Sequence, residues 1–383
     1  MANLQAVAVP TGASALSLLT AVEQALAGRV SLLPVPADDA RQSLLLTTTL
    51  RANAPIDDDV AMVVSTSGTT GVPKGAMLTA AALTASAHAT HRRLGGPGRW
   101  LLALPAYHVA GLQVLVRSVV AGTAPVAASG VDEFAAAIDA LGSGRRYASL
   151  VAAQLDKALR DPSAAAALAT LDAVLVGGGP MPAGVAEKAL AAGVSVVRTY
   201  GMSETCGGCV YDGVALDGVR VRVDSGAAAA SGPGRVVLGG MTLAKGYRNP
   251  VSPDPFAEPG WFRTDDLGAV TDSGVLSILG RVDDAISTGG LTVLPQLVEA
   301  ALAAHPDVAE CAVFGVADER LGQRVVAAVV PAGAASPSLD ELRRHVATTL
   351  PATAAPREMH VVDELPRRGI GKVDRAALIT RFS

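Results

Sequence analysis

The sequence predicts an α/β protein with a large N-terminal domain of α/β sheets that includes a β subdomain, followed by a small C-terminal α+β domain. Three observations support this prediction. Strand-like and helix-like segments alternate from residue 14 to residue 200, short β-rich runs follow from 218 to 279, and a second mixed stretch begins after 281. Strands that alternate with helices favour a parallel sheet covered on both faces. A chain of 383 residues also has the length of two or three domains.

Apolar spacing places the elements of the N-terminal part. Helical spacing covers 14–28 and 79–94, and short apolar runs predict strands at 60–65, 100–104, 149–152 and 173–176. Glycine and proline then separate β-rich runs at 219–223, 235–238 and 275–279.

A charged cluster at 280–284 interrupts the apolar segments and marks the domain junction. We therefore expect domains of residues 1–281 and 282–383, since about 100 residues can form an independent domain. Within the second domain the pattern predicts helices at 294–304 and 339–350 and strands at 308–316, 325–330 and 359–362.

Composition argues against several classes of function. A net charge of −4 and 3% aromatic residues do not favour nucleic acid or an anionic membrane as partner. No apolar stretch reaches the roughly 18–20 residues of a membrane span, and the N-terminus lacks the features of a secretory signal. Three cysteines cannot build a disulfide framework, so we expect a cytoplasmic protein. The oligomeric state stays open, a homodimer included.

Cys206 and Cys209 have the spacing of a C-x-x-C motif. A zinc site would need a second pair or nearby histidines, and a redox motif would need a thioredoxin-like context; neither accompanies these cysteines. We interpret them as residues that line a pocket.

A stretch rich in glycine and hydroxyl side chains lies between the strand expected at 60–65 and the helix expected at 79–94. Glycines let backbone N–H groups turn toward an anion, hydroxyls add donors, and Lys74 supplies a mobile positive charge. The stretch predicts a loop that binds nucleotide phosphates, and a flexible turn is the alternative. The candidate ligands are Ser65, Thr66, Ser67, Gly68, Thr69, Thr70, Gly71 and Lys74.

Five motifs in order, from about residue 60 to the C-terminus, resemble those of the adenylate-forming enzymes, which include acyl- and aryl-CoA ligases, peptide-synthetase adenylation domains and luciferases. The first motif is the loop just described. The others are Tyr200–Thr205 (Y-G-M-S-E-T), Gly260–Gly268 (G-W-F-R-T-D-D-L-G), Gly280–Asp284 (G-R-V-D-D) and Gly369–Arg375 (G-I-G-K-V-D-R). The resemblance implies the fold of these enzymes and the use of ATP, Mg²⁺ and coenzyme A.

The resemblance also implies roles for single residues. Tyr200 would stack on adenine, Ser203 would meet the α-phosphate, and Glu204 would hold Mg²⁺, which prefers one or two carboxylates with phosphate oxygens. Asp266 and Arg281 would bind the ribose, although Asp265 stands where the family has glycine. Glycine backbone would lie along the adenine and the acyl group at Gly177, Gly178 and Gly179, although a plain turn is the alternative, and Gly201 would also belong to the nucleotide site.

Lys372 is the expected catalytic lysine. The acid carboxylate and the ATP α-phosphate repel each other, and a lysine that bridges them relieves this repulsion as charge builds in the transition state. Gly369 and Gly371 suit a mobile loop, and Asp283 takes the family's hinge position. A surface lysine in a basic segment is the alternative for Lys372.

The substrate is indicated by a finer resemblance. His108 lies in a segment that resembles the one gating the family's acyl pocket. Taken alone, this residue would be interpreted as a core histidine, but beside the other motifs we assign it to the pocket. His108, Arg117 and residues 149–155 together resemble the o-succinylbenzoate–CoA ligases of menaquinone synthesis, in which an arginine at the place of Arg117 helps hold the second carboxylate. Arg117 could instead extend from a helix toward solvent. His88 and His91 lack a third ligand, so we expect them at the surface.

Three other functions compete with this hypothesis. Another acyl- or aryl-CoA ligase would share the chemistry. An ATP hydrolase or phosphotransferase would release ADP, but Gly75 after Lys74 breaks the Walker pattern. A non-catalytic nucleotide-binding module would not need Lys372.

Overall fold

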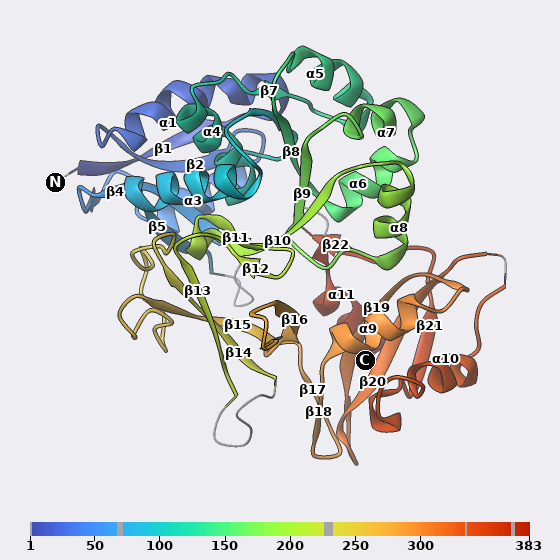
Figure 1. Cartoon of the computed structure of the whole chain (residues 1–383). Helices are drawn as coiled ribbons and strands as arrows, with labels where there is room; N and C mark the ends of the chain where they lie inside the picture. Colours follow the sequence, from blue (N-terminus) through green and yellow to red (C-terminus); the bar gives the residue numbers. More distant parts are fainter. Residues whose placement is uncertain (1, 67–71, 226–232, 334, 369–371) are drawn as a thin grey trace. The chain divides into compact units, whose positions relative to one another are not determined.

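The computed structural model describes residues 2–66, 72–225, 233–333, 335–368 and 372–383 (Figure 1). The chain divides into two compact units. The first unit comprises Met1–Arg222, Val237–Arg263 and Asp272–Leu276, and the second comprises Val223–Val236, Thr264–Thr271 and Ser277–Ser383. In the described part of the chain, no helix is long and apolar enough to cross a membrane.

The first unit contains a five-stranded sheet with the order β3-β1-β2-β4-β5. β1 pairs with β2 and β2 with β4 in parallel, whereas the outer strands β3 and β5 are antiparallel to their neighbours. Its strands are β1 (Ala2–Val9), β2 (Ser31–Pro36), β3 (Pro55–Ile56), β4 (Val60–Thr66) and β5 (Lys74–Thr79).

The seven-stranded sheet of the first unit has the order β12-β11-β10-β9-β8-β6-β7 and is parallel from β10 to β7. The alternation of helices and strands therefore produces the parallel sheet that it predicts. Its strands are β6 (Arg99–Leu102), β7 (Val126–Ala127), β8 (Arg146–Val151), β9 (Ala173–Gly177), β10 (Val196–Met202), β11 (Gly207–Tyr211) and β12 (Val214–Ala215).

Alternation along the strands divides the apolar residues between two cores. Trp100 and Tyr147 lie in one core with helices α1 (Leu19–Leu26), α3 (Ala80–Arg93) and α4 (Val109–Ala121), and that core also takes residues of β4 and β5. Their neighbours Leu101 and Ala148 lie in a second core. The helices of the second core are α5 (Phe134–Ala140), α6 (Ala152–Leu159), α7 (Pro162–Leu168) and α8 (Ala183–Ala191). Successive residues of a strand point to opposite faces, so both faces of this sheet are covered.

Four strands pair in sequence order into a further sheet. They are β13 (Val219–Asp224), β14 (Gly234–Gly240), β15 (Trp261–Val270) and β16 (Leu276–Arg281). The three predicted β-rich runs correspond to β13, β14 and β16, whereas β15 was not predicted.

The second unit is built around two long antiparallel strands, β19 (Val308–Asp318) and β20 (Gly322–Pro331). Val313 faces the core formed with α9 (Pro295–Ala303) and α10 (Leu339–Val346), whereas Phe314 faces the core formed with α11 (Arg375–Phe382). The remaining elements are α2 (Ala40–Thr49) in the first unit and β17 (Ile286–Thr288), β18 (Leu291–Val293), β21 (Glu358–Val361), β22 (Arg367–Arg368) and β23 (Lys372–Val373) in the second.

The structure departs from the predicted elements at several places. The helix expected at 14–28 is a 3₁₀ turn, Gly12–Leu18, followed by the short α1. β5 lies between the phosphate loop and α3, where we expected the loop to lead directly to the helix. The strand expected at 149–152 ends at Val151, where α6 takes over.

Candidate functional site

The phosphate loop connects two antiparallel strands. Ser65 pairs with Gly75 and Thr66 with Lys74 in the β4–β5 register. The two ends of the loop are therefore held side by side at the edge of the five-stranded sheet. The loop's central residues lie outside the described residues; they are Ser67, Gly68, Thr69, Thr70 and Gly71.

A segment distant in sequence, residues 244–249, fixes the strand that carries Lys74. The backbone N–H of Arg248 donates to Gly75 O at 2.7 Å, and that of Met77 donates to Gly246 O at 2.9 Å. The amide of Asn249 accepts from Gly75 N at 3.0 Å and donates to Pro73 O at 2.9 Å. Paired backbone groups of this kind make β5 a rigid support for Lys74.

Glu204 and Lys74 meet the same side chain, that of Tyr247. The Tyr247 hydroxyl donates to Glu204 Oε1 at 2.6 Å, and Lys74 Nζ lies 5.6 Å from the centroid of the Tyr247 ring. Glu204 is 6% exposed and Ser203 is 8% exposed. The structure thus brings the lysine of the phosphate loop and the carboxylate of the Tyr200–Thr205 motif together through a tyrosine.

Local backbone geometry explains the turn that presents Glu204. A Cβ at Gly201 would lie 2.1 Å from Gly207 O, so only glycine fits the close approach of β10 and β11. The strand register shifts between Tyr200 and Gly201. Thr205 Oγ1 accepts from Met202 N at 2.9 Å and donates to Gly207 O at 2.7 Å, which closes the turn.

The three consecutive glycines end strand β9 beside β10. A Cβ at Gly177 would lie 2.4 Å from Thr199 Oγ1, and Gly178 has a φ of +84° that disfavours other residues. No heavy atom of the described residues lies within 4 Å of a Cβ built at Gly179, which leaves its backbone open on that side. This geometry suits a ligand that runs along the strand end.

His108 precedes helix α4 at its N-cap position and is half-buried. Its ring lies 4.6 Å from the ring of Tyr107. A Cβ at Gly111 would lie 2.4 Å from Pro105 O, so the first turn of α4 packs directly on the loop that follows β6. His108 is therefore held at the point where this loop enters the helix.

Arg117 lies two turns into α4 and is 3% exposed, so it does not extend toward solvent. Its Nη1 lies 3.5 Å from Ser149 Oγ, its Nη2 lies 3.3 Å from Tyr211 Oη, and its guanidinium carbon lies 4.8 Å from the Trp100 ring. Nε has no hydrogen-bond partner among the described residues. Burial lowers the pKa of Arg117, and nearby Tyr211 counteracts this only in part.

The expectation that both histidines of α3 lie at the surface is wrong for His91. His88 is exposed, but His91 is 5% exposed and packs 6.4 Å from the Trp100 ring. Burial, followed by the charges of Arg117 and His88, lowers the pKa of His91 to about 4. A neutral imidazole thus lies beside the buried guanidinium.

The cysteines of the C-x-x-C motif are both buried and free. Burial raises the pKa of both thiols, that of Cys209 to about 12, and Cys209 adds to the increase at Cys206. Such thiols are inert. That these cysteines line a pocket stays a prediction. The Cys206 carbonyl accepts from Ser86 Oγ at 3.0 Å and from Gln113 Nε2 at 2.7 Å, and so joins α3 and α4 to β11.

In the second unit, three aspartates lie close to the guanidinium of Arg281. Arg281 Nη1 lies 3.3 Å from Asp266 Oδ1, and Nη2 lies 3.1 Å from Asp283 Oδ2 and 3.6 Å from Asp265 Oδ2. Burial alone lowers the pKa of Arg281, but Asp266, Asp283 and Asp265 together raise it above the usual value. Asp266 is 8% exposed and its backbone is fixed by Thr264, whereas the side chain of Asp265 is 44% exposed.

Lys372 begins β23, whose partner strand is β22. The preceding residues of its motif, 369–371, lie outside the described residues. The chain that follows is anchored, because Arg375 is bound by the carboxylate of Glu299.

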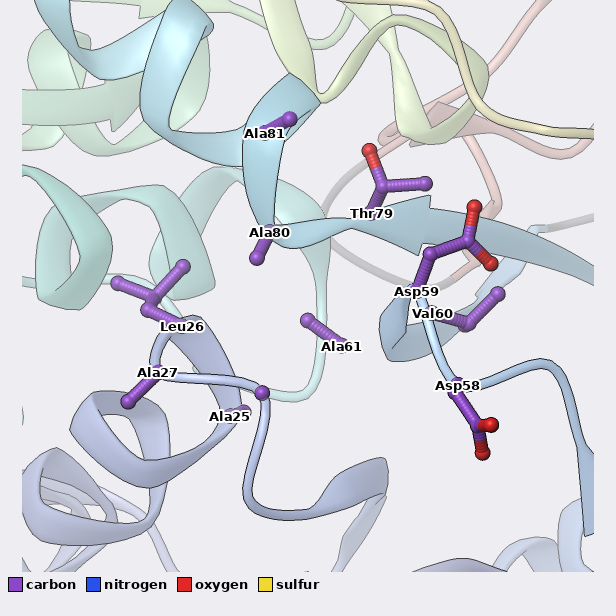
Figure 2. A pocket seen from close by; sticks show the side chains of 11 residues that line it. Ala25, Leu26, Ala27, Asp58, Asp59, Val60, Ala61, Thr79, Ala80 and Ala81 are labelled. Atoms are coloured by element: carbon purple, nitrogen blue, oxygen red, sulfur yellow. The ribbon is translucent and has the colours of Figure 1, made fainter. Parts of the chain in front are cut away.

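A pocket lies elsewhere in the first unit. It has a volume of about 430 Å³ and is lined by small residues from the end of α1 and the start of α3, together with Asp58 and Asp59 (Figure 2). Among the described residues, none of the predicted site residues lines it. Asp59 is paired with Lys245 at 2.9 Å, and the predicted chemistry gives this pocket no role.

Sequence reasoning missed Tyr247, Asn249 and the aromatic surroundings of Arg117. Residues 244–249 lie in a stretch assigned only to a β subdomain. A signal was present, because the chain has only five tyrosines and one of them follows a glycine in a turn-rich segment.

The fold and these motifs define the class of protein. Residues 7–248 match the AMP-binding enzyme family, and residues 297–372 match the AMP-binding enzyme C-terminal domain. The chain belongs to the AMP-binding enzyme family.

Particular relatives are closely similar. The chain is 65% identical to the probable 2-succinylbenzoate–CoA ligase of Mycobacterium tuberculosis over 99% of each chain. The structure matches o-succinylbenzoate CoA synthetase (MenE) from Bacillus subtilis in complex with the acyl-adenylate intermediate OSB-AMP, with a TM-score of 0.82, 25% identity and coverage of 98% of this chain and 88% of that chain. It also matches that enzyme in complex with ATP and magnesium ion, with a TM-score of 0.81, 25% identity and coverage of 98% and 89%. These matches confirm the predicted fold class.

Proposed function

We propose that this chain is an AMP-forming acid–CoA ligase that converts 2-succinylbenzoate to its CoA thioester in menaquinone synthesis. One observation carries the proposal: the buried guanidinium of Arg117 lies on the helix after His108 in a chain 65% identical to a probable 2-succinylbenzoate–CoA ligase. The acid has two carboxylates, of which one is activated and the other must only be bound. A buried planar cation suits the second carboxylate.

The reaction has two steps. A carboxylate oxygen of the acid attacks the α-phosphorus of ATP, the bond from phosphorus to the bridging oxygen breaks, and pyrophosphate leaves with both electrons. The thiol of CoA then loses its proton and its sulfur attacks the acyl carbon. The bond between that carbon and the AMP oxygen breaks, and AMP leaves.

Residues of the first unit would bind the nucleotide phosphates and the adenine. Backbone and hydroxyl groups from Ser65 to Gly71, with Lys74, would surround the phosphates, and Ser203 would meet the α-phosphate. Tyr200 would stack on adenine beside Gly201, and the acyl-adenylate would lie along Gly177–Gly179. The geometry of the two strand ends supports this proposal, because a side chain at Gly177 would clash with Thr199 and the positive φ of Gly178 disfavours any other residue.

Glu204 would hold Mg²⁺, and the residues present fit that ion. Magnesium favours one or two carboxylates together with phosphate oxygens and water. The described residues contain no group of three or more metal-ligating side chains. A single buried carboxylate near the phosphate loop is the arrangement that Mg²⁺ favours when phosphate oxygens and water supply its other ligands. When bound, Mg²⁺ neutralises negative charge on the phosphates.

Residues of the second unit would complete the reaction. Asp266 and Arg281 would bind the ribose hydroxyls, and Lys372 would stabilise the charge that develops between the acid and the α-phosphate. Asp283 would be the hinge between a domain of residues 1–281 and one of residues 282–383. The ion pair that joins Arg281 to both Asp266 and Asp283 supports a link between ribose binding and the hinge.

His108 would border the acyl pocket, with Arg117 deeper along the same helix. A related acyl- or aryl-CoA ligase is the second candidate, because the adenylation residues would be the same. We also propose a cytoplasmic location, which is supported by the three free cysteines. A homodimer is the quaternary state that sedimentation would test.

The experiment is product analysis by mass spectrometry with ATP, Mg²⁺, CoA and one acid at a time. We expect AMP and the thioester with 2-succinylbenzoate, and little turnover with benzoate or succinate. Preferential turnover of monocarboxylates would contradict 2-succinylbenzoate as the substrate, but it would still support an acid–CoA ligase. Release of ADP would contradict the proposed reaction.

A further inference from the structure

The side chain of Tyr247 contacts both Glu204 and Lys74, through its hydroxyl and its ring respectively. These two residues have opposite charges and opposite tasks, because an ammonium attracts phosphate oxygens whereas a carboxylate attracts a cation. Both tasks require the groups to point at a ligand and not at each other. A neutral side chain that touches each of them can hold the two charges in separate orientations.

The backbone around Tyr247 is fixed on two sides. Residues 244–249 run along β5, with a bridge between Ala76 and Tyr247 and a hydrogen bond of 2.9 Å from Lys245 N to Met77 O. At the start of the segment, Ala244 N donates to the backbone carbonyl of Glu204 at 2.8 Å. The segment therefore joins the strand of Lys74 to the turn of Glu204.

The next residue anchors the segment from behind. The guanidinium of Arg248 donates to the backbone carbonyls of Pro55 at 2.7 Å and Leu50 at 3.3 Å, and also reaches those of Arg51 and Ala54. The Tyr247 ring itself is held by an edge contact with Phe256, with centroids 5.5 Å apart. A side chain supported in this way keeps one orientation, which a positioning residue requires.

We propose that Tyr247 is a positioning residue of the nucleotide site: its hydroxyl orients the carboxylate of Glu204 toward a divalent cation, and its ring holds the ammonium of Lys74. The inference rests on the proposed function, in which Glu204 holds the cation that accompanies ATP. Hydrogen bonds from a neighbouring side chain to a metal-binding carboxylate fix its direction, and their loss typically costs about 10–100-fold in metal affinity or activity.

Two variants separate the two contacts. Tyr247→Phe removes the hydroxyl and keeps the ring, so it should weaken cation binding and leave nucleotide binding at saturating cation unchanged. Tyr247→Leu also removes the ring, so it should weaken nucleotide binding as well. Tyr147→Phe is the matched control, because the Tyr147 hydroxyl is bonded to the backbone carbonyls of Leu94 and Gly96 and to the Arg145 side chain.

The measurement is titration of the full-length protein with Mn²⁺, followed by electron paramagnetic resonance of the free ion, in the presence of α,β-methylene-ATP. We expect Tyr247→Phe to raise the dissociation constant of Mn²⁺ about tenfold, and Tyr147→Phe to leave it unchanged. A parallel Mg²⁺ titration of AMP formation should show the same shift. Thermal unfolding of each variant checks that the fold is kept.

Each outcome decides one claim. Equal Mn²⁺ affinity of Tyr247→Phe and the unchanged protein would contradict the proposed role of Tyr247, but it would not affect the proposed ligase activity. An equal loss in Tyr147→Phe would also overturn it, because the effect would then be structural. Failure of the unchanged protein to bind Mn²⁺ with the nucleotide, or to form AMP, would instead contradict the proposed function.

Discussion

Nη2 of Arg375 lies 2.6 Å from Oε1 and 2.8 Å from Oε2 of Glu299, so one guanidinium nitrogen is shared by both oxygens of the carboxylate. The same side chain donates from Nε to Val313 O at 3.2 Å, and its Nη1 lies 3.5 Å from Asp284 Oδ2. Arg375 follows Lys372 by three residues. The pair thus fastens the chain beyond the proposed catalytic lysine to helix α9 and to β19.

Removing the charge of Glu299 should destabilise the second unit. Its side chain is 15% exposed, and Glu299→Gln leaves a largely shielded guanidinium with only the more distant carboxylate of Asp284. We expect the free energy of unfolding to fall by about 2 kcal/mol, in the range for hydrogen bonds to charged groups. Urea unfolding measures this change.

Glu310→Gln is the matched control, because its pair with Arg367 is 45% and 39% exposed. Exposed pairs contribute about 0–1 kcal/mol. Equal losses in the two variants would show that the Arg375–Glu299 pair is no more than a surface contact.

Lys372→Ala should slow adenylation far more than it slows thioester formation. The lysine is proposed to stabilise charge only in the first step, and one such donor contributes about 10²–10³ in rate. Pyrophosphate release from acid and ATP should therefore slow by that factor, whereas CoA should still react with chemically prepared acyl-AMP. Lys188→Ala, which changes an exposed lysine of α8, should do neither. An equal loss in both half-reactions would assign Lys372 a different role.

Arg117→Met should change activity and stability in opposite directions. Loss of a charge-assisted contact of about 1.5–3 kcal/mol should lower kcat/KM for 2-succinylbenzoate about 10–100-fold, with the KM for ATP unchanged. The ligand-free protein should become more stable, because a buried cation with no carboxylate partner in the described residues is replaced by an apolar side chain of similar volume. Kinetics and urea unfolding test the two signs separately, and loss of both activity and stability would indicate a structural cation.

His91 should make the protein less stable as the pH falls. Its pKa is about 4 in the fold, against 6.5 for the free side chain, so between these values the unfolded chain binds the additional proton. The free energy of unfolding therefore decreases as the pH falls from 6.5 to 4, by on the order of 3 kcal/mol for this residue at the lower limit.

Urea unfolding of His91→Gln between pH 7.5 and pH 4.5 should show a shallower decline than the unchanged protein. His88→Gln, which alters an exposed histidine on the same helix, should follow the unchanged protein closely. If the free energy of unfolding declined with pH in the same way in all three proteins, the fold would not lower the pKa of His91.

Much of the fold could be predicted because it depends on local patterns. β9, α3, β19 and β20 follow apolar runs or helical spacing. β2 could not be predicted, since Pro34 and Pro36 argue against a central strand, and yet β2 lies between β1 and β4 with Pro34 in register with Val7. α4 is apolar on most sides because it packs between other helices and the seven-stranded sheet, so its periodicity is weak.

The candidate site could be predicted where one motif holds several of its residues. Glu204 and Ser203 share a turn whose residues are consecutive, and Asp266 and Arg281 lie on neighbouring strands. The contact from Tyr247 to Glu204 joins residues 43 positions apart, and Arg248 reaches residues nearly 200 positions away. Contacts of that range depend on the complete fold, so no local pattern could indicate them.

The most direct test of the central claim is oxygen transfer from the acid to AMP. 2-Succinylbenzoate labelled with ¹⁸O in its carboxylates is incubated with ATP, Mg²⁺ and CoA, and the phosphate-containing products are analysed by mass spectrometry. Activation as an acyl-adenylate places one ¹⁸O atom in AMP, together with unlabelled pyrophosphate. Label in inorganic phosphate with formation of ADP, or AMP without label, would contradict the account.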